Sequence, residues 1–193
     1  HFEREAKKVW KYFEKCLKDD IKPFKYRHRA LAWSCGSTYY DNSTNWLYQC
    51  WGIMTVINMD SLTGHNIVDT ENRDEMMSDL ADLHARTPMR THTVGGNRHI
   101  LMMFETAAKF NCDMIVMYDD IGCKGMAGCQ GLLEEEFRKH PEFHIMWMPH
   151  ALMDCRTVPT AEARKVVNDY MTTVLHEEPV DPSLVDFDDS EGW

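Results

Sequence analysis

The first stretch of the chain carries apolar residues at helical spacing. Val9, Trp10, Phe13 and Leu17 fall on one face of a helix over residues 2–17. The pair Lys22-Pro23 ends this pattern, because the residue before a proline disfavours the helical conformation. The chain is therefore expected to begin with an amphipathic helix.

Four short apolar runs follow, and most of them do not alternate with polar residues, as is typical of strands buried on both faces. They cover residues 30–34, 53–59, 113–118 and 144–148, and helical patterns cover residues 43–51, 71–85, 98–110, 128–140 and 160–175. This alternation predicts an α/β fold with a doubly wound, Rossmann- or flavodoxin-like parallel sheet of about four strands and helices on both faces. In such folds ligands bind beyond the carboxyl ends of the strands.

Charge and composition exclude several functions. The net charge of -10 opposes binding to the phosphate backbone, so nucleic acid is not an expected partner. No run approaches the roughly 18 apolar residues of a membrane span, and the first segment lacks the pattern of a signal peptide. The seven cysteines are odd in number and lack Cys-x-x-Cys spacing, which indicates a reducing cytoplasm.

One loop carries distinctive chemistry, directly after the predicted strand at 113–118. Cys123 lies there between Gly122 and Lys124, with Gly125 and Gly128 following. We expect the glycines to adopt backbone conformations closed to other residues and to admit a bulky inorganic ligand. Lys124 and the next helix's N-terminus would favour a thiolate. These residues leave three roles open for Cys123, namely metal ligand, nucleophile or inert buried thiol.

The other candidate residues have simpler explanations. Zinc needs three or four ligands, whereas Cys123 and Cys129 lie too far apart in sequence for a ligand pair and no histidine pair accompanies them. Asp119 and Asp120 are expected to cap the turn or to be solvated. Structural roles are expected for the remaining cysteines and for three histidines: Cys16, Cys35, Cys50, Cys112, His99, His144 and His150.

The order strand, Tyr-x-x-x-Gly-Cys-Lys, helix resembles the second-lobe cluster loop of the 2-hydroxyacyl-CoA dehydratase and benzoyl-CoA reductase family. Here the motif runs from Tyr118 to Lys124. The resemblance extends over roughly residues 27–175, and Asp154-Cys155-Arg156 is similar to the family's Asp-Pro-Arg, with Cys155 replacing the proline. The family implied is that of subunits similar to component D of 2-hydroxyglutaryl-CoA dehydratase.

The resemblance implies a [4Fe-4S] cluster with Cys123 as one ligand and with Gly122, Lys124 and Gly125 around it. In this family two further ligands come from a preceding lobe, although Cys129 or Cys155 are alternatives within this chain. The implied domain division has residues 1–22 as a helix leading in from a missing preceding lobe, 23–176 as the C-terminal α/β lobe, and 177–193 as an acidic tail. The tail is expected to be a solvated extension, since its acidic run cannot bury much surface.

The implied reaction is the loss of water from a 2-hydroxyacyl-CoA through a ketyl radical. The implied partners are a second homologous subunit and an ATP-dependent iron–sulfur activator that delivers the electron; the piece alone is expected to be inactive. Two alternatives are a lobe of a benzoyl-CoA reductase-like or double-cubane cluster reductase, and a noncatalytic flavodoxin-like lobe that binds an anion or a partner. A third is an enzyme with Cys123 as nucleophile.

Overall fold

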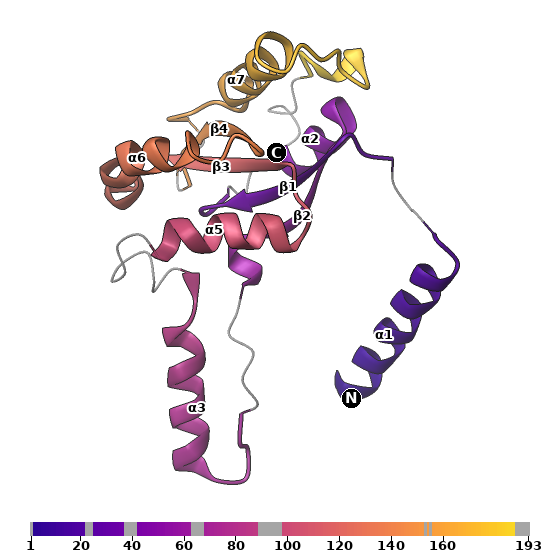
Figure 1. The fold of residues 1–193 in the computed structure, drawn as a ribbon, viewed down its shortest axis with the longest axis vertical. Coiled ribbons are helices and arrows are strands. Elements are labelled where there is room, and N and C mark those ends of the chain that lie inside the picture. Colours follow the sequence, from indigo (N-terminus) through magenta and orange to yellow (C-terminus); the bar gives the residue numbers. More distant parts are fainter. Residues whose placement is uncertain are drawn as a thin grey trace.

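The protein has one parallel sheet, shown in a computed structural model that describes residues 2–21, 25–36, 42–62, 68–88, 98–152, 154 and 156–187. Its strands are β1 (His28–Trp33), β2 (Ile53–Asn58), β3 (Met114–Asp120) and β4 (His144–His150). They pair in the order β2-β1-β3-β4, all parallel (Figure 1). The predicted fold class is confirmed.

Helices cover both faces of the sheet, because successive strand residues point to opposite sides. Ala30 and Ala32 of β1 pack with α2 (Ser43–Trp51) and α7 (Thr160–Thr173). Leu31 and Trp33 point the other way, toward α5 (Arg98–Lys109) and α6 (Lys124–Phe137). The two clusters bury nearly all the surface of the apolar residues of the central strands, which explains the near-continuous apolar runs in the sequence.

The strand order creates a switch point between β1 and β3. From β1 the chain crosses to β2 on one side, and from β3 it crosses to β4 on the other. The two central strands are paired from Ala30 with Met114 to Trp33 with Met117. The loops that follow β1 and β3 therefore diverge from neighbouring points on the same edge, where doubly wound folds open a crevice.

Helix α6 corrects the expected structure of the cysteine loop. It begins at Lys124, not at residue 128, so Gly125 and Gly128 lie inside the helix. Among the described glycines only Gly52 has a positive φ, which is +71°. The glycines after β3 therefore do not provide the special backbone conformations that we expected. Burial of Met126 in the first turn supports a helix start that glycine's low helix propensity concealed.

The expectation of a solvated C-terminal extension is wrong for residues 177–187. Trp46 Nε1 donates a hydrogen bond to the Leu184 carbonyl at 2.8 Å, and Asn168 Nδ2 donates to the Val185 carbonyl at 3.2 Å. Leu184 lies in the short helix η2 (Pro182–Leu184), and both residues pack against the α2/α7 cluster. The acidic composition concealed these contacts, which use the backbone and two apolar side chains; residues 188–193 lie outside the described part.

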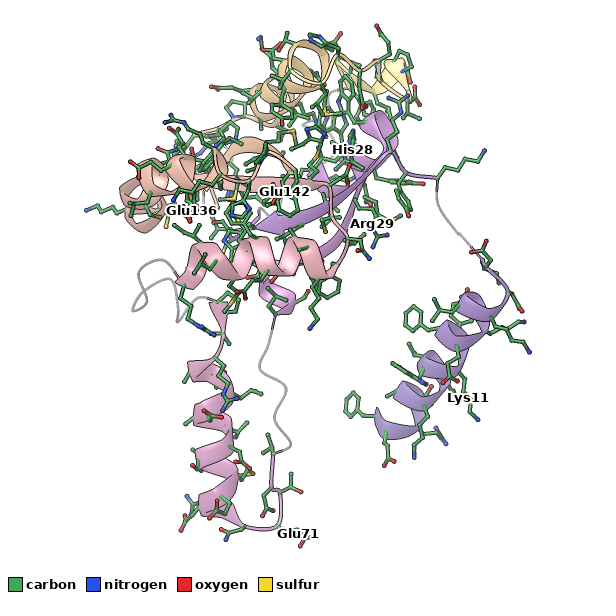
Figure 2. The ribbon with its side chains drawn as sticks, in the orientation of Figure 1. Lys11, His28, Arg29, Glu71, Glu136 and Glu142 are labelled. Carbon is green, nitrogen blue, oxygen red and sulfur yellow. The ribbon has the colours of Figure 1, made fainter. Side chains whose placement is uncertain are left out.

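Two helices stand away from the sheet. Helix α1 (Phe2–Lys18) and helix α3 (Arg73–Ala85) bury no residue of their own, and Figure 1 shows both projecting from the body. In Figure 2 side chains crowd around the sheet, whereas Lys11 of α1 and Glu71 before α3 point away from it. Within the described residues, no helix is both long and apolar enough to cross a bilayer.

Candidate functional site

A cavity of about 150 Å³ lies at the switch point, over the carboxyl ends of β1 and β3. The loops after all four strands and the starts of α5 and α6 contribute to its lining: Ser34, Cys35, Met59, His99, Asp120, Cys123, Met126 and Leu152. Pockets that enclose organic ligands are larger, at roughly 300–1,000 Å³. The cavity therefore suits an ion, a small inorganic group or one end of a larger ligand.

Cys123 occupies the N-cap position of α6 and is half-buried. Its backbone N–H donates to the Asp120 carbonyl at 2.8 Å, and its own carbonyl accepts from Ala127 at 3.1 Å. The thiol makes no capping hydrogen bond to the helix. Cys123 thus lies at the N-terminal end of α6, where the helix dipole is positive.

The residues predicted to surround a bound group lie next to Cys123. Gly122 belongs to the turn before the helix, while Lys124 and Gly125 form its exposed first turn. Of the predicted set, only Cys123 itself lines the cavity. Gly122, Lys124 and Gly125 lie outside that lining, and their role in binding a cofactor stays a prediction.

Asp120 connects two of the loops that form the site. Its Oδ1 accepts hydrogen bonds from the backbone N–H of Gly122 at 3.1 Å and of Leu152 at 3.3 Å. This carboxylate thus ties the loop after β3 to the loop after β4. Asp119 accepts from Gln130 Nε2 of α6 at 3.2 Å, so the expected capping of the turn is seen for Asp120, whereas Asp119 contacts a helix side chain.

Cys35 reaches the same cavity from the loop after β1. It is half-buried and packs against the α5/α6 cluster, as the sequence led us to expect, but it also lines the cavity. Burial raises the pKa of its thiol, and the charges of Asp60, Cys123 and Asp120 raise it further. Its place directly after a central strand was the signal that sequence reasoning overlooked.

His99 at the start of α5 is a second cavity residue that the sequence did not reveal. Trp33 Nε1 donates to His99 Nε2 at 2.9 Å, and both side chains are buried. Because an indole nitrogen only donates, Nε2 must be unprotonated and the ring proton lies on Nδ1. His99 is therefore a neutral histidine held by the core, consistent with its expected structural role.

The comparison with protein families decides what kind of protein this is. The model of the family 2-hydroxyglutaryl-CoA dehydratase, D-component, matches residues 2–155. The chain belongs to this family. It is thus a 2-hydroxyacyl-CoA dehydratase-type subunit, of a system in which component D works with partner subunits. No curated protein matches the chain significantly, and neither does any solved structure.

The donor set for a metal in this D-component-like chain is limited. Among residues that the structure describes, no group of three or more His, Cys, Asp or Glu side chains is placed to hold a metal ion. Cys129 directs its thiol to the Gly125 carbonyl at 3.0 Å, and burial raises its pKa. The alternative ligand Cys155 lies outside the described residues. The described chain therefore offers thiols to a metal at the cavity, but not a complete ligand set.

The two charged residues of the motif after β4, Asp154 and Arg156, bind each other. Arg156 forms a two-pronged ion pair with Asp154, with Nε–Oδ1 at 2.8 Å and Nη2–Oδ2 at 2.7 Å. Hydrogen bonding to Arg156 lowers the pKa of Asp154 to about 2. A phosphate contact by Arg156 would have to compete with this carboxylate.

Proposed function

We propose that this chain is the C-terminal, cluster-holding lobe of a subunit of a radical 2-hydroxyacyl-CoA dehydratase. In this proposal Cys123 ligates one iron of a [4Fe-4S] cluster, and residues 1–22 lead in from a preceding lobe. The supporting observation is the position of Cys123, at a helix N-terminus and on the cavity at the sheet's switch point. Family membership supports the dehydratase class of reaction.

The residues at the cavity fit such a group. Iron–sulfur clusters are bound through thiolates, and the Cys123 thiol is half-buried and uncommitted to capping. The backbone N–H groups in the first turn of α6 stabilise negative charge at this sulfur. Since the described residues do not complete a ligand set, the remaining ligands would come from the preceding lobe.

The proposed reaction removes water from a 2-hydroxyacyl-CoA to form a 2-enoyl-CoA. The C2–hydroxyl bond breaks and a proton leaves C3, so the substrate gains and loses no electrons overall. When bound, the cluster supplies the single low-potential electron that starts the elimination, delivered by the ATP-dependent activator. This chain's residues hold that electron carrier: Cys123 anchors it, and Asp120 fixes the two loops beside it.

The size of the cavity bears on where the substrate binds. A volume of about 150 Å³ cannot enclose an acyl-CoA, so the nucleotide part of the substrate would lie outside it. A partner subunit or the preceding lobe would complete that binding surface. Catalysis is therefore proposed for the assembled enzyme and not for this lobe alone.

The rival function, binding of an anion at this loop, is less well supported. Among the described residues that line the cavity, Asp120 supplies a negative carboxylate and no Lys or Arg is present. A phosphate would meet repulsion from this carboxylate. A positively charged or electron-poor ligand would not.

Anaerobic reconstitution with iron and sulfide tests the proposal, on this chain and on a chain extended through the preceding lobe. Cys123→Ser should lower the bound iron or change the low-temperature EPR signal of the extended chain. Cys16→Ser is the matched control, because Cys16 lies on α1, which buries no residue. Iron binding that is indifferent to Cys123 would contradict the proposal and favour the anion- or partner-binding lobe.

A further inference from the structure

The cavity brings together two thiols that are far apart in the sequence. Cys35 follows β1 and Cys123 follows β3, and both line the same cavity. The described cysteines Cys16, Cys50, Cys112 and Cys129 lie outside its lining. Because β1 and β3 are paired neighbours in the sheet, the convergence of the two thiols is built into the strand order.

The backbone holds Cys35 in this position. Ser34 has a φ of +71°, a left-handed conformation that turns the chain immediately after β1. For a residue with a side chain this costs about 1 kcal/mol, which surrounding packing must offset. Gly36 then passes so close to Tyr118 that an added Cβ would lie 3.2 Å from the ring. A strained turn against a neighbouring strand is the kind of feature found at functional sites.

The charge around the two thiols favours a cation. The carboxylate of Asp120 lines the cavity beside both thiols, while Met59, Met126 and Leu152 supply apolar walls. Two cysteine sulfurs beside a carboxylate in a partly apolar cavity match the preferences of soft metal ions.

We propose that Cys35 is a second sulfur ligand of this centre, so that Cys35 and Cys123 together hold a thiophilic metal. The identity of that metal rests on the proposed function, under which Cys35 and Cys123 both ligate iron of the cluster. Binding of a divalent ion converts two thiols to thiolates and releases two protons, with no change of oxidation state. The remaining coordination positions would be filled by sulfide, water or residues outside this lobe.

Titration of the 193-residue chain with Cd²⁺ tests the thiol pair without iron. The wild type should show thiolate-to-metal charge-transfer absorbance and proton release corresponding to two thiols. Cys35→Ser and Cys123→Ser should each weaken Cd²⁺ binding by more than about tenfold. Loss of a direct ligand should lower metal affinity at least as much as loss of a residue that only hydrogen-bonds to a ligand. The double variant should bind little worse than either single variant, because both substitutions disrupt one site.

Cys129→Ser is the matched control, since a hydroxyl keeps the hydrogen bond to the Gly125 carbonyl at a position next to the cavity. It should bind Cd²⁺ as the wild type does. Cd²⁺ binding that is unchanged in Cys35→Ser, or weakened equally in Cys129→Ser, would contradict the proposal that Cys35 and Cys123 are the two ligands.

Reconstitution with iron and sulfide separates this inference from the proposed function. If Cys123→Ser alters the EPR signal of the extended chain and Cys35→Ser does not, the second ligand is refuted while the cluster proposal stands. If Cd²⁺ binds through both thiols but neither substitution changes iron binding or the EPR signal, the two thiols form a metal site that does not hold the cluster. If both variants alter the signal, both proposals are supported.

Discussion

At the scale of single residues, the cysteines divide by burial. Cys50 lies in the α2/α7 cluster, and Cys112 lies in the α5/α6 cluster. Burial is the main reason why the pKa of each thiol rises from about 9 to about 11. These two thiols remain protonated at neutral pH and act as small apolar residues, as the sequence led us to expect.

The two raised pKa values predict a loss of stability in alkaline solution. Between pH 9 and 11 the unfolded thiols ionise while the folded ones do not, so the native state binds more protons and stability falls as the pH rises. The expected loss is on the order of 2 kcal/mol for each thiol. Urea unfolding across this range measures it, and a Cys50→Ala/Cys112→Ala variant should show a shallower slope than the wild type. Equal slopes would contradict the prediction.

At the scale of elements, residues 177–187 pack over α2 and α7, and we call this segment the strap. Arg164 is buried, places its guanidinium 5.1 Å from the Trp46 ring and donates to the Phe187 carbonyl. At the opposite end of the segment, His28 Nδ1 lies 2.7 Å from Asp113 and Nε2 lies 3.0 Å from Glu177. Figure 2 labels His28, which is the first residue of β1.

Truncation tests the strap. A chain ending at Leu175 should lose on the order of 3–5 kcal/mol of unfolding free energy, because several part-buried hydrogen bonds and the His28–Glu177 contact disappear together. A chain ending at Phe187 is the control, since it keeps every contact described for the segment. Chemical denaturation compares the two. Equal midpoints would mean that the segment contributes nothing to the folded lobe.

At the scale of the whole molecule, the sheet and its four packed helices form the stable unit. Helix α1 exposes the apolar residues Trp10, Phe13 and Leu17 and buries none of its side chains. Its helical pattern was read correctly from the sequence, but a helix with an apolar face need not pack on the nearest sheet. The domain division at residues 22 and 176 stays a prediction.

Deletion of residues 1–21 should therefore leave the free energy of unfolding of the remaining chain within about 0.5 kcal/mol of its original value. Loss of a helix that buries nothing removes no core contact. Urea unfolding followed by tryptophan fluorescence measures the change, with a Trp10→Phe variant of the full chain correcting for the lost fluorophore. A clear drop in the midpoint would show that α1 packs on the lobe in solution.

The sequence by itself determined the kind and order of the elements, the doubly wound class and the cysteine loop after β3. These follow from periodicity, which reports the faces that each segment must bury, and from local turn chemistry. Only the tertiary structure decided that Cys35 joins Cys123, that α6 begins at Lys124, and that residues 177–187 pack on the core. These features depend on which strands pair and on which side chains meet across long sequence distances. The spacing of residues within one segment does not specify such contacts.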